Sequence, residues 1–243
     1  FKERLFFCIN NSLSFGYLPI NNVAGSVSTF NLGSIFNMGG YIQSIGQWTR
    51  DGGSGPDDYI VFVTNHGEAA IYTGSDPSDA TKWSLVGTFK LPRPIGKRCL
   101  ININSDLVLI CEQGFMPLSQ TLVTGENAPA KAISDKISGS ILDSVNNFAS
   151  TFGWQAIIYP KGQYGLFNVP TSTIGDFNQY VVNVSTGAWG RFTGQNSYCW
   201  ELLNGALYFG ENTKVFKADN GDSDNTTAIQ GDAKTAFIYY GGR

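Results

Sequence analysis

Residues 58–74, Asp-Tyr-Ile-Val-Phe-Val-Thr-Asn-His-Gly-Glu-Ala-Ala-Ile-Tyr-Thr-Gly, have the pattern of a β-hairpin. Apolar and aromatic residues dominate 59–64 and 68–73, which is typical of strands. Between them stands Asn65-His66-Gly67, and Asn-Gly-type turns accept the positive φ angles that tight hairpins require. The stretch therefore predicts two antiparallel strands joined by a short turn.

The same pairing of strand-like runs recurs along the chain. The other pairs are 4–10 with 12–18, 107–112 with 115–120, 154–159 with 164–169, and 206–210 with 214–218. The first runs of the five pairs start at residues 4, 59, 107, 154 and 206, so the steps are 55, 48, 47 and 52 residues. A four-stranded blade of a β-propeller takes about 40–50 residues.

We therefore predict an all-β chain, a β-propeller of about five four-stranded blades in a single domain over 1–243. The approximate blades are 1–37, 41–92, 95–150, 153–194 and 197–241. Within them the strands, from the central channel outward, are expected at 41–48, 59–64, 68–73 and 83–89; at 98–104, 107–112 and 115–120; at 154–159, 164–169, 180–184 and 188–192; and at 198–203, 206–210, 214–218 and 235–240.

The start of the chain fits this register only in part. Residues 4–10 and 12–18 look like the second and third strands of a blade whose first strand is missing. If the propeller closes with five blades, residues 235–240 or residues after Arg243 must complete that first blade.

Two expected outer strands carry the same signature. Residues 82–89, Lys-Trp-Ser-Leu-Val-Gly-Thr-Phe, resemble residues 188–194, Ala-Trp-Gly-Arg-Phe-Thr-Gly. Trp83 and Trp189 are 106 residues apart, which is two blade periods. We expect each Trp to pack between neighbouring blades, because the units of a repeat array bury area against one another.

One segment, 130–150, departs from the strand pattern. Its apolar residues fall at helical spacing, and Pro129 stands where a helix can begin. These apolar positions are Ile133, Ile137, Ile141, Leu142, Val145 and Phe148. We predict an amphipathic helix, despite Gly139, that replaces or overlies the outer strand of its blade. It either packs on the rim of the propeller or serves as a partner-binding element.

Composition narrows the possible classes of protein. Only 35 of 243 residues are charged, and the 14% they represent is well below the roughly 25% of ordinary domains. The apolar content of 42% and the aromatic content of 14% exclude disorder, and the sparse charge excludes a coiled coil. A net charge of −3 offers no electrostatic footprint for nucleic acid. No apolar run is long enough to span a membrane.

The sequence indicates no catalytic, cofactor-binding or metal-binding residues. Cys8, Cys99, Cys111 and Cys199 lack paired metal-ligand spacing and are expected as free thiols, although a Cys99–Cys111 bridge stays open. His66 is expected in a solvated turn. The acidic loops 50–58 and 220–232 do not match a calcium-binding loop. Glu201 is the one acid within an expected first strand, with Asp51, Asp106 and Asp176 in loops. We expect no enzyme.

Several stretches resemble structural proteins of tailed bacteriophages, in particular the β-propeller tail nozzle or hub proteins of short-tailed phages. These stretches are 1–7 with 12–19, 58–77, 94–99, 114–120, 186–194 and 199–210. The resemblance implies a virion protein, assembled in the host cytoplasm, that forms a ring of copies, a hexamer in that family. It also implies contacts with the adjacent head–tail connector and tail proteins, and transient passage of DNA without specific binding.

Two other functions stay open from the residues alone. A carbohydrate-binding propeller for host attachment would present exposed aromatics, with Trp48, Tyr198 or Trp200 as candidates. A propeller glycosidase would need carboxylates about 5–10 Å apart in the channel.

Overall fold

The structure is a computed structural model that describes residues 1–51, 56–123, 131–224 and 227–233. It is mostly β, as predicted, and each of its main sheets is an antiparallel meander of strands consecutive in sequence. The first sheet holds β1 (Phe6–Cys8), β2 (Ser14–Tyr17) and β3 (Ser28–Asn31), and the second holds β4 (Ile42–Asp51), β5 (Pro56–Thr64), β6 (Glu68–Gly74) and β7 (Trp83–Lys90).

Three further sheets follow in chain order. The third is formed by β8 (Leu100–Ile103), β9 (Asp106–Cys111) and β10 (Gly114–Pro117). The fourth is formed by β11 (Gln155–Tyr159), β12 (Tyr164–Pro170), β13 (Phe177–Asn183) and β14 (Trp189–Phe192). The fifth holds β15 (Cys199–Leu203), β16 (Ala206–Glu211) and β17 (Lys214–Lys217), and a small hairpin of β18 (Ser223–Asp224) and β19 (Thr227–Ala228) comes last.

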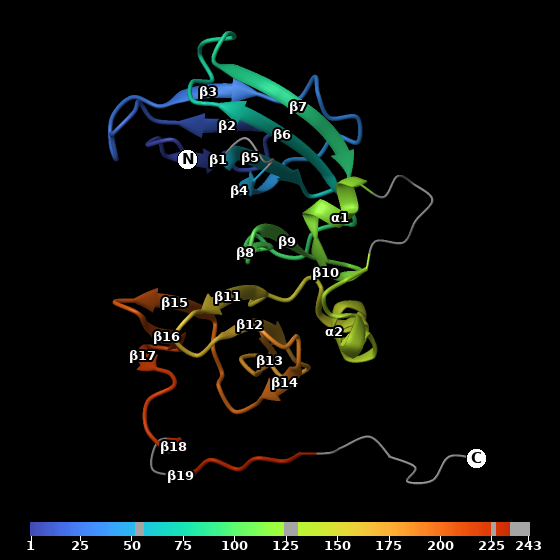
Figure 1. Cartoon of the computed structure of the whole chain (residues 1–243), viewed down its shortest axis with the longest axis vertical. Helices are drawn as coiled ribbons and strands as arrows, with labels where there is room; N and C mark the ends of the chain where they lie inside the picture. Colours follow the sequence, from blue (N-terminus) through green and yellow to red (C-terminus); the bar gives the residue numbers. More distant parts are fainter. Residues whose placement is uncertain (52–55, 124–130, 225–226, 234–243) are drawn as a thin grey trace, which may run out of the picture.

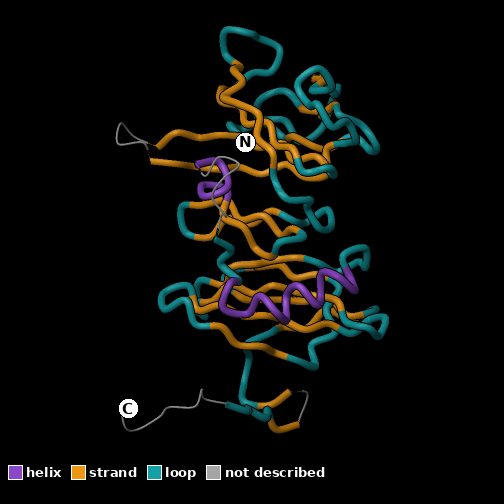
Figure 2. Tube along the Cα trace, turned by 90° about the vertical axis from the view of Figure 1, so that its right-hand side faces the viewer, coloured by secondary structure: helices purple, strands orange, loops and turns teal. Residues whose placement is uncertain are grey.

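The five main sheets are arranged as an open fan (Figure 1). The first strands of successive sheets are neighbours: β4 lies beside β8, β8 beside β11, and β11 beside β15. The later strands of each sheet lie further from this inner row. Figure 2, turned by 90°, shows the sheets one above another. The described sheets do not close into a ring. The structure thus establishes a fan of three- and four-stranded sheets, and a closed five-bladed propeller is not part of it.

The opening hairpin forms as predicted between β5 and β6. Gly67, in its turn, has a φ of +87°, and a Cβ there would meet the Leu91 carbonyl oxygen at 2.3 Å. His66 is half-buried in the same turn, with its Nδ1 2.9 Å from the Met38 oxygen. Glycine is therefore required at position 67 for both its backbone angle and its contact with the next loop.

The first sheet has the strand directions expected for a blade without its first strand. The Ile42 N–H, where β4 starts, donates to the Ser12 carbonyl at 2.9 Å, in the turn after β1. At the opposite end, Arg4, just before β1, reaches Asp76 in the turn after β6. β1 is therefore antiparallel to β4 and parallel to β5. This is the direction expected for the second strand of a blade. Residues 235–240 lie outside the described residues.

Aromatic packing between sheets repeats with a period of two sheets. Phe15 on β2 stacks on Phe62 of β5 with ring centroids 4.4 Å apart, and Trp83 lies over Tyr72 at 5.2 Å. Two sheets further on, Phe115 of β10 stacks on Phe167 of β12 at 4.0 Å, with Trp189 at 5.6 Å from Phe167. Trp83 also contacts Phe6 of the preceding sheet, and Trp189 contacts Phe115. Both Trp residues thus pack between neighbouring sheets, as predicted.

The helical segment starts later than predicted. The helix α2 covers Ser138–Phe148, preceded by a 3-10 turn at Asp135–Ile137, and buries Ile141 and Val145. Residues 131–134 are not helical, because the Ile133 N–H donates to the Phe115 carbonyl at 2.9 Å and the Phe115 N–H donates to Ser134 Oγ at 3.1 Å. α2 packs beside β10 and β12, so it covers the outer edge of the three-stranded third sheet.

Two local expectations need correction. The strand predicted at 115–120 ends at Pro117, and a short helix α1 (Leu118–Val123) follows. The Asp106 carboxylate accepts hydrogen bonds from the Ser119 N–H, at 3.2 Å, and from its hydroxyl, which favours a helix start there. The strand β3 was not predicted, because its sequence, Ser-Thr-Phe-Asn, has only one apolar residue.

Candidate functional site

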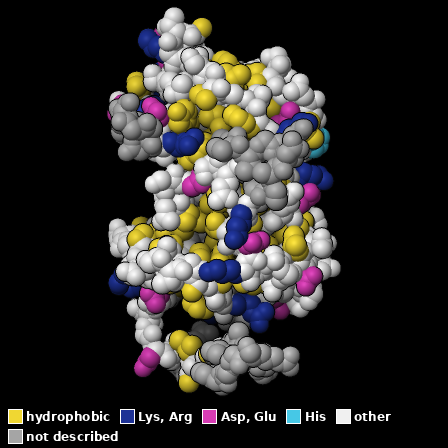
Figure 3. Space-filling view, turned by 45° about the vertical axis from the view of Figure 1, so that its right-hand side comes forward, with side chains coloured by type: hydrophobic (Ala, Val, Ile, Leu, Met, Phe, Trp, Pro, Cys, Tyr) yellow, Lys and Arg dark blue, Asp and Glu magenta, His cyan; other side chains and the backbone are white. Residues whose placement is uncertain are grey.

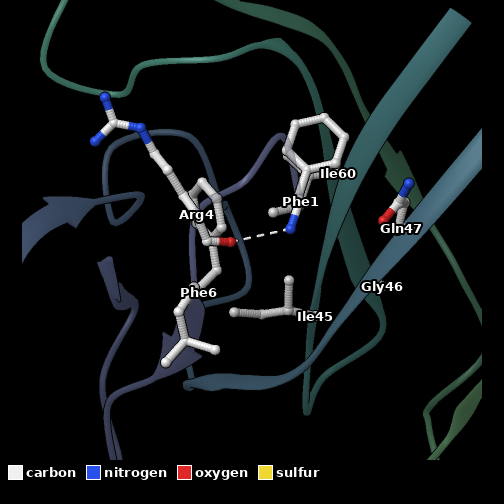
Figure 4. Close-up of a pocket in the computed structure, with 8 residues that line it drawn as sticks. Phe1, Arg4, Phe6, Ile45, Gly46, Gln47 and Ile60 are labelled. Carbon is white, nitrogen blue, oxygen red and sulfur yellow. Dashed lines mark hydrogen bonds between the residues drawn. The ribbon is translucent and has the colours of Figure 1, made fainter. Parts of the chain in front are cut away.

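A mainly apolar groove lies beside β1, on the side that pairs with no described strand, between the first and second sheets. Its volume is about 210 Å³. The lining residues are Phe1, Arg4, Leu5 and Phe6 from the start of the chain, Ile45, Gly46 and Gln47 from β4, and Ile60 from β5 (Figure 4). In that view the Arg4 guanidinium points away from Ile45 and Gln47, out of the groove. The groove is therefore lined by backbone and mainly apolar side chains, with the polar side chain of Gln47 among them.

Ion pairs hold the segment before β1 against the second sheet. Arg4 Nη2 lies 2.7 Å from Asp76 Oδ2, and Lys2 pairs with Asp58. The pKa of Asp76 is lowered by hydrogen bonds from the Ser78 hydroxyl and N–H, with Arg4 adding to the effect. The pKa of Asp58 is lowered by hydrogen bonds from Lys2 and Thr49. These two carboxylates are ionised at neutral pH and act as anchors for the groove wall.

A second cleft, of about 450 Å³, opens between the third and fourth sheets. Its charged side chains come from Lys131, Asp135 and Lys136, close to α2, and Val182 and Trp189 are among its apolar lining residues. Lys136 Nζ donates to the Gly187 carbonyl at 3.1 Å, which ties the helical segment to the turn before β14. The cleft carries charges of both signs, so its electrostatics select no single class of ligand.

A hydrogen-bonded cluster joins the third, fourth and fifth sheets. Gln155 Nε2 donates to the Trp200 carbonyl at 2.8 Å, while Gln155 Oε1 accepts from the Trp200 N–H and from Arg98. Asn168 Oδ1 accepts from Trp200 Nε1 at 3.1 Å and from Gln179 Nε2 at 2.9 Å. Sequence reasoning missed this cluster, since its residues are spread over 98–200 and form no motif.

A buried carboxylate also escaped prediction. Glu68 accepts hydrogen bonds from the N–H groups of Asn37 and Met38, at 2.9 and 2.8 Å. It thereby fixes the link from the first sheet to the second. The sequence around it, including Gly67 and Ala69, predicted only a β-hairpin. Nothing in that pattern indicated that the Glu68 carboxylate would be buried.

The aromatic candidates for sugar binding lie inside the fan. Trp48 is 2% exposed and Trp200 is 1% exposed, so neither offers a face for stacking. Tyr198 is half-buried and lies between Phe177 and Phe152. All five Trp residues of the chain lie in its described part, where four are buried and Trp189 is half-buried. The aromatics thus contribute mainly to contacts between sheets.

The acidic candidates Glu201, Asp106 and Asp176 lie on three different elements: β15, β9 and the loop before β13. Glu201 is exposed on β15, where its Oε1 accepts from the Leu202 N–H at 2.9 Å. Asp106 is engaged at the start of α1, as described above. The Asp176 carbonyl closes its own loop with Thr171. No group of three or more metal-ligating side chains occurs among residues 1–51, 56–123, 131–224 and 227–233. Parts of the loops 50–58 and 220–232 lie outside these ranges.

All four cysteines are free, so the Cys99–Cys111 bridge that the sequence left open is not formed. Burial raises the pKa of Cys99 and of Cys111 to about 12. Cys8 and Cys199 are exposed. The buried pair behaves as small apolar core residues.

No protein-family model matches this sequence, and no curated protein matches it significantly. No described helix is long and apolar enough to cross a lipid bilayer.

Proposed function

We propose that this chain is a structural component of a bacteriophage tail, similar to a nozzle or hub protein, that forms a ring around the DNA-ejection channel. The observation that carries the proposal is the repeating fan, in which Phe15–Phe62 and Phe115–Phe167 form the same stacked contact two sheets apart. A repeat array whose units bury area against each other provides shape and interfaces. In this proposal the fan is most of a five-bladed propeller, in one domain over 1–243.

The ends and edges of the fan supply surfaces for contacts between copies. Leu203 and Val215, on the outer face of the last sheet, are 60% and 76% exposed. Leu85 and Val86 on the outermost strand β7 and Phe192 on β14 are exposed as well. In Figure 3 hydrophobic side chains gather over the upper part of the face, which carries the second sheet. Exposed apolar residues that gather into a patch are typical of protein–protein interfaces, and in this proposal the exposed residues of each sheet contribute to contacts between copies.

The charge balance supports a channel that DNA crosses without binding. The chain has 16 Lys and Arg against 19 Asp and Glu. Affinity for phosphates comes from clustered Lys and Arg. A ring of such copies repels the DNA backbone weakly and lets it pass. The neighbouring partners would be the head–tail connector and other tail proteins, and the chain would act in the virion without catalysis.

Self-assembly of the purified full chain tests this proposal. Analytical ultracentrifugation over a range of micromolar concentrations should show a discrete oligomer, and negative-stain images should show rings. Val215→Asp should abolish the oligomer, because it places a charge in the apolar contact, while Leu142→Asp on the exposed side of α2 should not. A chain that stays monomeric throughout, or tight binding to duplex DNA at physiological salt, contradicts the proposal.

The tail position has its own test. Mass spectrometry of purified particles of the virus that encodes the sequence should recover the chain at a fixed copy number per particle. Recovery only from the soluble fraction of infected cells would rule out a virion role.

A further inference from the structure

The turn between β12 and β13 presents an apolar side chain to solvent. Ile174 is 96% exposed, the highest value among the large apolar side chains of the described residues. Hydrogen bonds within the turn hold it in shape, because the Thr171 N–H donates to the Asp176 carbonyl and the Asp176 N–H donates to the Thr173 carbonyl, both at 3.1 Å. Residues 171–176 therefore form a compact projection, which we call the Ile174 knob.

The Ile174 knob is connected to the exposed face of the last sheet. A Cβ at Gly175 would lie 2.9 Å from the Tyr198 hydroxyl, so the turn packs on that side chain. The Tyr198 N–H donates to the Gly210 carbonyl at 2.9 Å, and Gly210 pairs with Val215 of β17. This series of contacts links the knob to the exposed residue that the proposed function places between copies.

The cleft between the third and fourth sheets has the size and lining to receive such a knob. Its volume of about 450 Å³ lies within the range of about 300–1,000 Å³ that is usual for ligand pockets. Burial of exposed apolar surface favours association. The apolar side chains that line the cleft are Ile103, Ala132, Ile133, Val182, Val184 and Trp189.

The charges of the knob and of the cleft are complementary. At the cleft, Lys131 and Asp135 pair with each other at 3.8 Å, whereas Lys136 donates to the Gly187 carbonyl and has no carboxylate partner among the described residues. The knob carries a single charge, the carboxylate of Asp176, which forms no ion pair in the described part of the chain. Complementary charges fix the register of a contact between proteins.

The knob and the cleft lie at opposite ends of β13. This strand starts at Phe177, close to Ile174, and ends at Asn183, which lines the cleft. At about 3.3 Å per residue, its length separates the two by about 20 Å. A knob that fills the cleft must therefore come from a second copy of the chain.

We propose that the Ile174 knob of one copy inserts into the cleft between the third and fourth sheets of the next copy, with Asp176 facing Lys136. This inference rests on the proposed function, because it names the two surfaces through which copies in the ring meet. Each copy contributes two different surfaces, so the contact is heterologous. Contacts of this type close into a ring or continue as a filament.

Complementation between two variants of the full chain tests this contact. Ile174→Asp damages the knob at a fully exposed position, and Val184→Asp damages the half-buried wall of the cleft. In sedimentation velocity each variant alone should form no ring. An equimolar mixture should form a dimer and nothing larger, because only one intact knob and one intact cleft remain in each mixed pair.

The matched control is Val23→Asp, at a side chain that is 92% exposed in the loop between β2 and β3. It should assemble like the unmodified chain. Circular dichroism shows whether Val184→Asp folds. If it does not, Lys136→Glu takes its place in the mixture, since this side chain is exposed.

A charge exchange tests the orientation of the knob. Asp176→Lys and Lys136→Glu should each weaken assembly about tenfold, because each places like charges opposite one another. The double variant should recover most of the loss, since the pair is restored with reversed polarity. Absence of any recovery would overturn the proposal.

The outcomes separate this inference from the proposed function. Unchanged assembly of Ile174→Asp, equal loss with Val23→Asp, or a mixture that stays monomeric would each overturn the inference while the ring of the unmodified chain stands. An unmodified chain that stays monomeric at every concentration contradicts the proposed function and this inference together.

Discussion

Between the first two sheets Phe15 lies on Phe62 with ring centroids 4.4 Å apart, and the indole N–H of Trp83 is buried without a partner among the described residues. Between the fourth and fifth sheets Trp200 is buried as deeply, yet its indole N–H donates to Asn168 Oδ1 at 3.1 Å. At the first junction the stacked rings make no hydrogen bond to one another, and the ion pairs Arg4–Asp76 and Lys2–Asp58 lie apart from these rings, at the start of the chain. The second junction adds a directional network to its apolar contacts.

This difference teaches how the two junctions tolerate change. Apolar packing depends on volume and shape, so substitutions that conserve volume cost little. A buried hydrogen-bond network depends on each partner, because a polar group left unpaired in the interior loses its interaction with water as well. We expect the junction of the last two sheets to be the more specific one and the junction of the first two to be the more adaptable.

The largest effect is expected for Asn168→Ala. Asn168 is fully buried, accepts hydrogen bonds from Gln179 and Trp200, and donates to the carbonyls of Gly153 and Ser197. Loss of four hydrogen bonds at about 1–1.5 kcal/mol each lowers the free energy of unfolding by about 5 kcal/mol. Urea denaturation measures it. The control Asn178→Ala, half-buried on β13, should change stability by less than about 1 kcal/mol; equal effects would show that the network contributes nothing particular.

The next effect concerns the apolar junction. Phe15→Ala should lower the free energy of unfolding by about 3–5 kcal/mol, because it removes a ring that is fully buried. Phe15→Leu should cost less than about 2 kcal/mol, since it conserves much of the volume. Phe152→Ala, at a ring that is 68% exposed, serves as the control. Thermal denaturation monitored by near-ultraviolet circular dichroism follows the three variants. If Leu is as damaging as Ala, the junction is not adaptable.

A matched pair of substitutions compares the junctions directly. Trp200→Phe removes a buried donor and leaves Asn168 Oδ1 with one partner fewer, whereas Trp83→Phe removes a donor that has no partner. Both lose similar apolar area. Trp200→Phe should therefore destabilise the chain by about 1–2 kcal/mol more than Trp83→Phe does. Chemical denaturation of both variants in one buffer measures the difference, and the reverse order would refute the assignment of the network.

The smallest effect is expected at the ion pair that anchors the start of the chain. The pKa of Asp76 is lowered below 3.8, chiefly by Ser78, so its carboxylate stabilises the folded state above that pH. This contribution is lost as the pH falls through the folded-state pKa. Asp76→Asn should reduce stability by at most about 1 kcal/mol near neutral pH. The deficit should shrink below pH 3.8.

Denaturation of the chain and of the Asp76→Asn variant across this range measures that deficit. The predicted sign fails if the deficit grows on acidification. Added salt should also reduce it, because exposed charges are screened.

Local signals predicted some features well. The Asn65-His66-Gly67 turn, the outer-strand positions of Trp83 and Trp189, and the helical phase of Ile141 and Val145 all follow from residues within a few positions of one another. Turn chemistry and side-chain periodicity are local properties of the chain, so they can be derived from it without a neighbour.

Other features depend on contacts far apart in sequence. From the sequence, Trp200 is only an aromatic residue on a short strand. Its indole N–H and backbone N–H find their acceptors, Asn168 and Gln155, on the fourth sheet. The start of α2 is set by the hydrogen bonds of Ser134 and Ile133 to Phe115, not by the helical pattern that extends before it. The candidate groove at β1 likewise exists only because β4 lies beside it.

The sequence by itself determined that this chain forms successive antiparallel strand pairs at intervals of about 50 residues, because the turns and the alternation of apolar residues act locally. The tertiary structure alone decided how these pairs meet. It placed Phe15 on Phe62 and Phe115 on Phe167, and it enclosed Trp200 in hydrogen bonds. The physical reason is that side-chain burial and hydrogen-bond pairing each require two surfaces in contact. These surfaces come from residues far apart in the sequence, so they form only when the chain has folded.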